Sequence, residues 1–595
     1  MKLNNPKYFT SATICFVIMF FIFFGTGLEN KLSSRLDNKL KYSPSESKQL
    51  VWIFFKDKVS NNYSQKEIST YLTKRSIQRR MNRIKNSEIT DDLDLPVNKD
   101  YIRELKEFGL EIKQISKWFN AVSCYATKTQ ISMISGKSFI NEIDLVSVYK
   151  NTGYHQTNDI SGNGETLEQS DNNPVSTSVI NYGPSLNQSN LIHVPPVHDL
   201  GYTGKNVLIA SFDAGFDNLQ HTCFDRMREK GLRSYDFVNG DSIVSNDTGR
   251  LGNGAHGTQT LSLICGFDPG WLISPAFDAE IILAKTENTE SETPLEEDNW
   301  IAAAEWADSL GADIITSSLT YLAFNAPHPS YTWEDMDGNT ARITLAAEIA
   351  VSKGIIVVSS AGNAGFNPDH NTLGAPADGK NVITVGAVTL GRQRIGFSSV
   401  GPTADGRIKP DVMALGLSTY TAFPGSGNVG YLNIGTGTSF SCPMVAGVCA
   451  LMLSANPLLT PQKVKELLLN TSDKTGPPDN LTGWGIVNAY SAVLAAVKIS
   501  NEIPGDFSID QNYPNPFNPS TTISIHLKRD ATLSVIIFDI LGKEKGHIVN
   551  KQFFNTGNHD LKYNPEVNGL QSGVYFYSLV ANGALVDTKK FIYLK

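Results

Sequence analysis

The sequence predicts an α/β domain whose parallel β-sheet is flanked by helices, with a small α+β unit before it and an all-β sandwich after it. Between residues 206 and 385, short and almost wholly apolar runs recur, as in strands that are buried on both faces. Stretches with helical spacing, residues 296–310 and 340–353, lie between the runs, and this alternation is typical of βαβ units. The predicted strands are residues 207–212, 280–284, 313–316, 355–358 and 382–385.

The composition narrows the class of protein. At 595 residues the chain is too long for one hydrophobic core, so several domains are expected. Hydrophobic residues make up 41% and charged residues 18%, which is ordinary for folded protein and argues against global disorder. A net charge of -8 gives no reason to expect a nucleic-acid partner. The six cysteines lack CxxC spacing, which excludes a disulfide scaffold and an obvious zinc site and leaves the pairing of Cys124, Cys223 and Cys265 open.

The first 27 residues have the pattern of a secretory signal peptide. Lys2 and Lys7 precede an apolar run at residues 14–24, and the small residues Gly25-Thr26-Gly27 follow it. The run is short for a membrane span, although an uncleaved membrane anchor is the alternative. We therefore expect export of the protein, with residues 1–27 as its signal peptide.

Residues 45–150 are predicted to form a compact α+β unit in which strands and helices follow the order of a split βαβ fold. The predicted strands and helices are residues 50–55, 65–85 (helix), 100–108 (helix), 111–115, 121–126 and 143–149. The first helix carries basic residues that are expected to form a solvated face rather than to meet a specific acidic partner. They are Lys74, Arg75, Arg79, Arg80, Arg83 and Lys85.

Residues 151–184 shift sharply to Asn, Thr, Ser, Gly and Asp, with little apolar periodicity. Such a composition predicts a linker that proteases can cleave. A folded unit between a signal peptide and a cleavable linker has the position of a pro-segment.

Polar side chains follow the predicted parallel strands, at the edge of the sheet where open α/β domains bind ligands. Asp213 ends the first strand, and Asn363 is the last residue of the polar segment that follows the fourth strand. His256 stands beside a glycine-rich loop at a helix start. Ser439 precedes an apolar run within residues 437–447, and a helix beginning there would aim free N–H groups at a reacting oxygen. Taken singly, each residue has an ordinary explanation as a cap, a turn or a structural residue.

Together these four residues assemble a mechanism for acyl transfer. Ser439 attacks a carbonyl carbon, while His256 takes its proton and later donates it to the leaving group. Asp213 fixes the imidazole tautomer, and Asn363 holds the oxyanion together with the backbone N–H of Ser439. The chain order Asp, His, Ser is that of subtilisin, and it differs from the orders of chymotrypsin and of the α/β-hydrolases.

Residues 185–499 resemble the catalytic domain of the subtilisin-like serine proteases, the subtilase family. The resemblance rests on four blocks in the expected order, residues 209–215, 255–258, 361–363 and 437–443. It implies a parallel sheet with flanking helices and serine-type endopeptidase activity on protein or peptide substrates. It also implies that the peptide binds as an added strand. The implied substrate-binding residues are Ser317, Ser318, Leu319 and Gly362.

The sequence departs from the family pattern at several positions, one of which is Cys442, where small residues are common. Gln259 stands where the family has a second histidine, outside the triad, and Thr320 and Tyr321 replace glycines, which is expected to narrow the cleft. The resemblance implies no cofactor for catalysis, and no metal ligand is assigned. Family members often bind calcium, but the sequence has no Asp-x-Asp-x-Asp-Gly loop, so a structural calcium site stays open.

The flanking units resemble known families as well. Residues 49–150 are similar to subtilase propeptides, more loosely than the catalytic part, which implies a segment that assists folding and inhibits the enzyme until it is cleaved. Residues 506–595 are predicted to form a small β-sandwich, with a passive carbohydrate- or protein-binding module as the plain alternative. The expected strands are residues 522–527, 533–539 and 573–581, with turns at residues 541–543 and 582–583.

The motifs of the C-terminal unit closely resemble type IX secretion sorting domains. They are residues 512–519, 539–543, 572–577 and 589–595. The resemblance implies the type IX secretion machinery as a partner. It also implies passage through the periplasm and across the outer membrane, followed by release or by anchoring at the cell surface.

The sequence therefore predicts an exported serine endopeptidase that is made as a zymogen and inhibited by its own propeptide. A non-catalytic surface binding protein on the same scaffold is one alternative, but all three triad positions and Asn363 carry competent residues. A serine enzyme that cleaves esters or transfers peptides is another. The sequence identifies neither the side chain that the primary pocket prefers nor the sites at which the precursor is processed.

Overall fold

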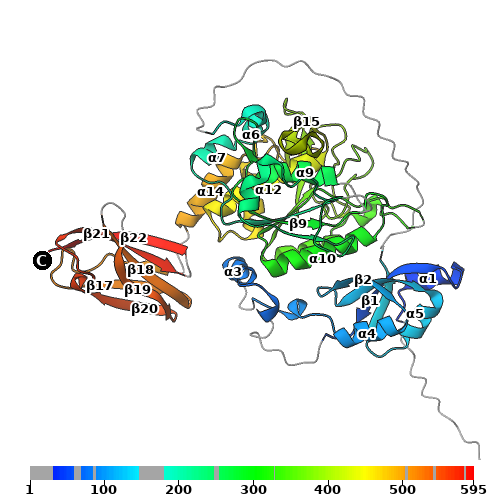
Figure 1. Cartoon of the computed structure of the whole chain (residues 1–595), viewed down its shortest axis with the longest axis horizontal. Coiled ribbons are helices and arrows are strands. Elements are labelled where there is room, and N and C mark those ends of the chain that lie inside the picture. Colours follow the sequence, from blue (N-terminus) through cyan, green and yellow to red (C-terminus); the bar gives the residue numbers. More distant parts are fainter. Residues whose placement is uncertain are drawn as a thin grey trace, which may run out of the picture.

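The computed structural model describes residues 31–58, 69–84, 89–146, 180–246, 254–326, 328–502, 507–539, 544–581 and 584–595. It has an N-terminal α+β unit, a central α/β unit and a C-terminal β unit, and the C-terminal unit stands apart from the other two (Figure 1). The predicted fold class is confirmed. The predicted signal peptide, and the predicted linker as far as residue 179, lie outside the described residues.

A seven-stranded parallel sheet forms the centre of the largest unit. Its strands run in the order β13-β12-β11-β10-β5-β9-β6, and every neighbouring pair is parallel. All five predicted strands are present, whereas β6 and β13 were not predicted. The sequence of β6, Arg-Ser-Tyr-Asp, contains no apolar run. The strands are β5 (Leu208–Asp213), β6 (Arg233–Asp236), β9 (Glu280–Lys285), β10 (Ile314–Ser317), β11 (Ile356–Ser360), β12 (Ile383–Val388) and β13 (Val412–Leu415).

Helices cover both faces of this sheet, and alternate residues of β5 face two separate cores, as the period of a strand requires. Ile209 packs into the core that contains α9, α12, α13 and α14, and Phe212 packs into the core that contains α10 and α11. The helices are α9 (Gly254–Cys265), α10 (Leu295–Leu310), α11 (Arg342–Ser352), α12 (Thr438–Ala455), α13 (Pro461–Thr471) and α14 (Ala489–Glu502).

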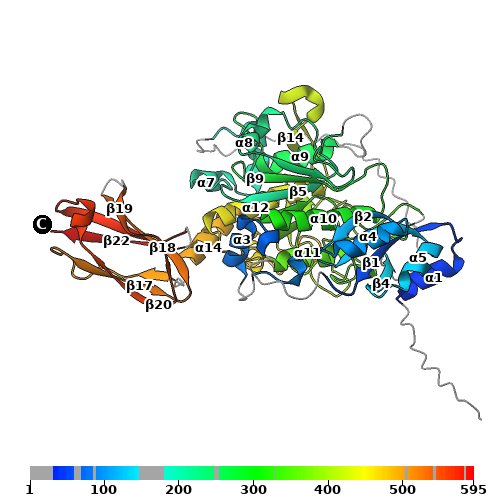
Figure 2. The same cartoon turned by 60° about the horizontal axis from the view of Figure 1, so that its bottom comes forward.

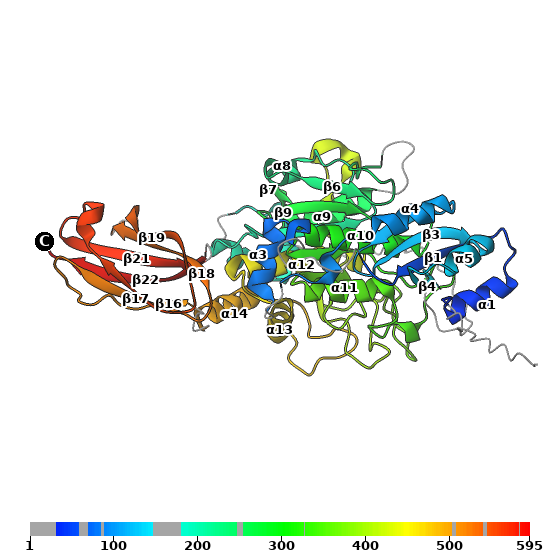
Figure 3. The same cartoon turned by 90° about the horizontal axis from the view of Figure 1, so that it is seen from below.

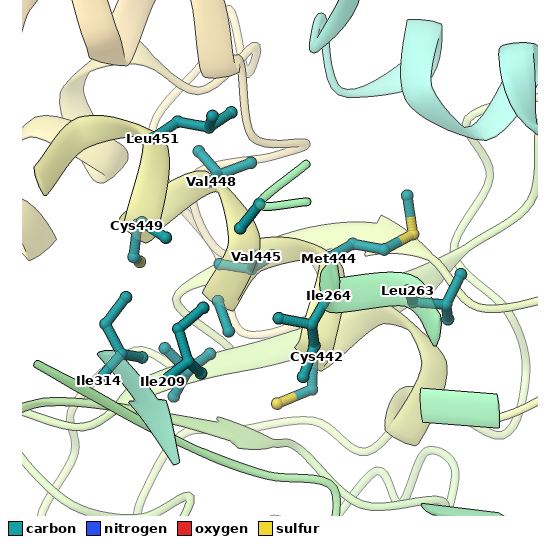
Figure 4. Packing of buried hydrophobic residues seen from close by; sticks show 14 of the residues in the cluster. Ile209, Leu263, Ile264, Ile314, Cys442, Met444, Val445, Val448, Cys449 and Leu451 are labelled. Carbon is teal, nitrogen blue, oxygen red and sulfur yellow. The ribbon is translucent and has the colours of Figure 1, made fainter. Parts of the chain in front are cut away.

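Helix α12 is the central helix of the first core. Figure 4 shows it packed near Ile209 and Ile314 of the sheet. Among the described residues it is the one helix long and apolar enough to cross a membrane, but 83% of it is buried inside the protein. Its hydrophobicity is therefore that of a core helix, and its position at the sheet fixes the residues of its first turn.

The N-terminal unit is a four-stranded antiparallel sheet with helices, in the split βαβ order that the sequence predicts. The last strand ends at Leu145, before the predicted end at residue 149, and residues 147–149 lie outside the described residues. The elements are α1 (Ser34–Tyr42), β1 (Lys48–Phe55), α3 (Lys74–Arg83), α4 (Lys99–Glu107), β2 (Glu111–Ser116), β3 (Ala121–Thr127), α5 (Lys128–Ser135) and β4 (Ile140–Leu145).

This unit docks on helices α10 and α11 of the central unit (Figures 1 and 2). The carboxylate of Glu305 in α10 accepts hydrogen bonds from Ser116 Oγ at 2.5 Å, from the backbone N–H of Lys117 at 2.9 Å and from that of Trp118 at 3.1 Å. Trp52 and Trp118 are buried in the core that α10 and α11 share. Apolar packing and a buried carboxylate thus hold the two units together.

The prediction of a solvated basic face on the first helix of this unit is wrong. Arg79, Arg80 and Arg83 of α3 are buried, and each pairs with an aspartate of the central unit. The partners are Asp308 at the end of α10 and Asp313 just before β10. The spacing of basic residues shows only that they share a face. It does not show that carboxylates more than 200 residues further along the chain cover that face.

The C-terminal unit is a sandwich of two antiparallel sheets, with strand orders β16-β17-β20 and β19-β18-β21-β22 around one core. The predicted strands match β17, β18 and β21, whereas β19 and β20 escape prediction because they are mostly polar and exposed. Residues of the predicted turns, 541–543 and 582–583, lie outside the described residues. The strands are β16 (Phe507–Ile509), β17 (Thr521–Leu527), β18 (Ala531–Asp539), β19 (Glu544–Phe554), β20 (Gly557–Tyr563), β21 (Gly573–Ala581) and β22 (Ala584–Tyr593).

Shorter elements complete the central unit, and its cysteines are unpaired. Cys223, Cys265, Cys442 and Cys449 are free and buried, as is Cys124 of the N-terminal unit. The shorter elements are α6 (Leu186–Leu191), α7 (Pro195–Asp199), α8 (Asp225–Glu229), β7 (Phe267–Asp268), β8 (Leu272–Ile273), β14 (Thr419–Ala422) and β15 (Tyr431–Gly435).

Candidate active site

An aspartate and a histidine form a hydrogen-bonded pair at the carboxyl end of the sheet. Asp213 is the last residue of β5 and fully buried, and its Oδ1 lies 2.7 Å from Nδ1 of His256 in the first turn of α9. Oδ1 also accepts the backbone N–H of Ala214 at 2.8 Å, and Oδ2 accepts Thr260 Oγ1 at 2.9 Å. These bonds fix the carboxylate, so it holds the imidazole in one orientation.

A glycine next to the histidine allows α9 to approach the end of β5. A Cβ atom at Gly257 would lie 2.0 Å from the carbonyl oxygen of Gly215 and 3.0 Å from Cβ of Asp213. Burial lowers the pKa of His256, but attraction and the hydrogen bond from Asp213 outweigh it, so the net shift of the pKa is upward. The side chain of His256 remains 36% exposed, which leaves its other ring nitrogen accessible.

Ser439 is the second residue of α12, and Gly437 precedes this helix with φ 140°, a conformation that L side chains rarely adopt. Ser439 is 9% exposed. Its Oγ donates to the carbonyl oxygen of Ser318 at 3.0 Å, and no hydrogen bond to His256 is formed among the described residues. The ring of Phe440 meets His256 edge to face, with 5.7 Å between centroids, and so positions the imidazole on the side of α12.

Asn363 lies across from the start of α12. Its Oδ1 accepts the backbone N–H of Thr438 at 2.9 Å and the Thr438 hydroxyl at 3.0 Å. Because the oxygen takes both bonds, the amide nitrogen faces away from Thr438 and keeps its two hydrogens for another acceptor. Gly362 supports the arrangement, since its N–H donates to Thr438 Oγ1 at 3.2 Å.

These groups surround one cavity of about 500 Å³. The lining residues are Ala214, His256, Glu287, Asn288, Thr289, Glu292, Ser318, Leu319, Thr320, Asn363 and Ser439. A histidine, a serine hydroxyl and a carboxamide therefore face the same space, as acyl transfer by a serine nucleophile requires. The parallel sheet explains this, because the carboxyl ends of β5 and β10 meet at one edge.

The structure places the predicted site residues in two groups. His256, Ser439, Asn363, Ser318 and Leu319 line the cavity. The three others lie behind it, namely Asp213 on His256, Gly362 beside Thr438, and Ser317, whose Oγ accepts the indole N–H of Trp300 at 3.1 Å.

Sequence reasoning missed several residues of the site. Glu287 and Glu292 follow β9, and the rule that led to Asp213, a polar residue after a parallel strand, could have found them. Thr260 and Thr438 gave no local signal, because a threonine inside or at the start of a helix is commonplace.

Comparison with known families agrees with this geometry. Residues 204–485 match the subtilase family, residues 50–161 match the peptidase S8 propeptide domain of Bacteroidota, and residues 511–594 match the secretion system C-terminal sorting domain. The sorting domain marks the protein as secreted or held at the cell surface.

Individual relatives are found over the same region. Subtilisin from Bacillus pumilus is 33% identical over 308 residues, which cover 51% of this chain and 96% of that protein. Subtilisin NAT from Bacillus subtilis subsp. natto is 33% identical over 304 residues, which cover 51% of this chain and 69% of that protein. Together with the propeptide and sorting-domain matches, these similarities show that the chain belongs to the subtilase family of serine endopeptidases.

Proposed function

We propose that this protein is a secreted endopeptidase that cleaves peptide bonds with a triad of Asp213, His256 and Ser439, and that it is made as a zymogen. The observation that supports this most directly is the shared cavity, which Ser439, His256 and Asn363 line while Asp213 holds the far side of the imidazole.

In the first step, Ser439 Oγ leaves the Ser318 carbonyl, turns to His256 and attacks the carbonyl carbon of the scissile bond. His256 Nε2 takes the hydroxyl proton, and Asp213 stays ionised and stabilises the imidazolium through Nδ1–H. The oxyanion that forms accepts the Asn363 amide and the backbone N–H of Ser439, where the dipole of α12 also favours negative charge.

Collapse of the tetrahedral intermediate breaks the C–N bond and leaves the acyl group on Ser439. His256 donates its proton to the departing amine, which leaves as the new N-terminus of the second fragment. Water then attacks the acyl-enzyme, with His256 as the base again, and releases the carboxylate product. Each step uses a group of this chain, and we propose no metal-dependent step.

For the peptide, we propose Ser318 and Leu319 as direct contacts, since both line the cavity. Ser317 lies behind these contacts and accepts the indole N–H of Trp300, and Gly362 donates to Thr438 at the start of α12. A peptide added as a strand would gain backbone hydrogen bonds along this segment.

The domain boundaries that we propose follow the order of processing. Residues 1–27 are the signal peptide, 45–150 the inhibitory propeptide, 151–184 the linker, 185–499 the catalytic domain and 506–595 the sorting domain. The docking of the N-terminal unit on Glu305 supports its role as an inhibitor that binds its own enzyme. We propose that the sorting domain directs the enzyme through the periplasm and across the outer membrane.

Labelling with a fluorophosphonate probe tests the proposed nucleophile. We expect the activated protein to take up one probe per chain at Ser439, identified by mass spectrometry, because only a serine activated by a base reacts readily. Casein hydrolysis should fall in proportion to the labelled fraction. Labelling at another serine, or full activity after complete labelling of Ser439, would show that the assignment is wrong.

A further inference from the structure

Three carboxylates converge at the wall of the cavity. Glu287 and Glu292 line it, and Glu296 lies behind them in the first turn of α10. One carboxylate oxygen from each of the three lies within 4.8 Å of the other two. Glu287 is 7% exposed and Glu296 is 1% exposed, so the cluster is buried except on its cavity side.

The negative charge of this cluster is not balanced by the protein. None of the three carboxylates forms an ion pair within the described parts of the chain. Glu287 accepts the hydroxyl of Tyr321, and Glu296 Oε2 accepts the backbone N–H of Thr293 at 2.7 Å. The other oxygen, Glu296 Oε1, is buried and has no hydrogen-bond partner among the described residues. A buried acceptor without a donor is costly, and it belongs to one of the three carboxylates that converge here.

The pKa values of the three carboxylates are raised above the ordinary value of a glutamate. Burial raises the pKa of Glu292 to about 7. Burial and the neighbouring carboxylates raise the pKa values of Glu287 and Glu296, and Asp213 adds to the repulsion at Glu287. The phenol of Tyr321 donates to Glu287 and remains neutral, because burial raises its own pKa well above its ordinary value. Near neutral pH, the three carboxylates therefore keep protons that isolated glutamates would lose.

We propose that this cluster binds the ammonium or guanidinium group of a lysine or arginine side chain of the peptide substrate. The inference rests on the proposed function and names its substrate class. Apart from His256, the residues that line the cavity include no basic side chain. The cavity also holds Ser439, so a cation bound at the cluster lies within side-chain reach of a peptide in the cleft.

A set of peptide nitroanilides tests this site on the activated protein. Each peptide carries lysine, arginine or uncharged norleucine at one of the four positions before the scissile bond. We expect lysine or arginine to raise kcat/KM at one position by ~10-fold or more over norleucine. The advantage should grow as the pH rises through about 7, because Glu292 attracts a cation only when it is ionised.

Glu292→Gln should remove most of this advantage, and Glu290→Gln provides the matched control. Glu290 lies in the same loop but is exposed and does not line the cavity, so its variant should keep the ratio of lysine to norleucine cleavage. Cleavage of norleucine peptides without any preference for basic residues would overturn the inference and leave the proposed function intact. Cleavage of none of the peptides would instead count against the proposed function.

Three carboxylates can also bind a metal ion such as calcium, and this is the alternative to be tested. The same assays are run on chelated enzyme and with millimolar calcium. A basic preference that is unchanged by calcium supports the inference. Calcium that binds the wild type but not Glu292→Gln, and that abolishes the preference, would overturn it.

A second and independent inference concerns the arginines of α3. Arg79 Nη1 donates to the carbonyl oxygen of Ala312 at 2.8 Å, just beyond the end of α10, and Arg83 Nη1 donates to that of Gly354 at 3.2 Å, just beyond the end of α11. Two guanidinium groups thus cover the carboxyl-terminal ends of two helices, where the helix dipole is negative. Figure 3 shows α3 beside the central unit, away from the sheet of its own unit.

Buried ion pairs reinforce this contact. Arg80 bridges Asp94 of its own unit at 2.7 and 2.8 Å and Asp308 of α10 at 2.7 Å. Arg83 pairs with Asp313 at 2.8 Å, and the side chain of Arg83 finds all its hydrogen-bond partners among the described residues in the central unit. Asp313 precedes the amino end of β10, whereas the cavity lies at the carboxyl end of that strand, so α3 contacts the enzyme at the edge opposite the site.

We propose that α3 is a second anchor of the propeptide. It keeps the cleaved propeptide bound at the far edge of the enzyme, and activation requires its release. Loss of Arg83 leaves the buried carboxylate of Asp313 with the half-exposed Arg75 as its remaining ion-pair partner among the described residues. Removing one member of a buried ion pair is strongly destabilising.

Gel filtration of the self-cleaved full chain tests this anchor. We expect the propeptide to dissociate ~100-fold faster in Arg83→Gln than in the wild type, and activity to appear after a shorter lag. Lys74→Gln is the control, since Lys74 lies exposed on the same helix. Arg75→Gln should show a smaller change in the same direction, and its half-exposed position leaves folding unaffected. Wild-type dissociation rates in both Arg83→Gln and Arg75→Gln would overturn the proposal.

Discussion

Replacing Ser439 by alanine is expected to lower kcat for casein or peptide hydrolysis by about 10⁶-fold, the size of loss measured for the nucleophile of subtilisin itself. The reason is that no acyl-enzyme can form without the hydroxyl, and His256 alone has no nucleophile to activate. The variant should also remain an uncleaved precursor, since the proposed processing uses the same serine. Kinetics on purified protein, and its size on a denaturing gel, measure both effects.

Ser441→Ala is the matched control for this change. Ser441 lies two residues further along α12, fully buried, and its Oγ donates back to the carbonyl oxygen of Thr438 at 2.9 Å. Its loss removes one hydrogen bond within the helix and should leave most of the activity. If Ser439→Ala and the wild type hydrolyse casein equally, or if the loss falls on Ser441→Ala instead, the assigned nucleophile is wrong.

Replacing Asp213 by asparagine is expected to lower kcat by about 10⁴-fold at neutral pH, the size found for the same change in a Ser-His-Asp triad. The side chain keeps its volume, so the packing at the end of β5 should survive. An asparagine that donates toward Nδ1 of His256 would favour the wrong tautomer, and the imidazolium would lose the carboxylate that stabilises it. Steady-state kinetics with a peptide substrate measure the loss.

Asp369→Asn controls for the loss of one carboxylate elsewhere, because Asp369 is exposed and far from the triad in sequence. Its activity should match that of the wild type. Circular dichroism should show that Asp213→Asn keeps the native content of helix and strand. A folded Asp213→Asn variant with wild-type kcat would contradict the role of Asp213 as the residue that orients His256.

Much of the fold follows from local patterns. The five predicted strands of the parallel sheet are present because nearly continuous apolar runs form strands that are buried on both faces. Asp213 and Asn363 could be found because they follow such strands, and Ser439 because it opens a helix that is buried almost throughout. Polar strands such as β6 and β20 carry no pattern of this kind.

The wrong and missed predictions have one physical origin. A sequence pattern shows that a face is apolar or charged, but it does not show what lies against that face. The basic face of α3 was expected to meet water, yet Arg80 meets Asp308, which is 228 residues further along the chain. Likewise, Glu287 and Glu292 are ordinary loop residues in the sequence, and their position on the cavity follows from the packing of β9 beside β5.

By itself, the sequence determined the three folded units, the order of Asp213, His256 and Ser439, and the helix that carries the serine, because each of these depends on residues close together in the chain. The tertiary structure decided which groups meet. It joined His256 to Asp213, turned the Asn363 amide away from Thr438 and buried the arginines of α3 against the ends of α10 and α11. Such contacts depend on how distant segments pack. The low dielectric of the interior strengthens an ion pair or a hydrogen bond only when packing buries both partners.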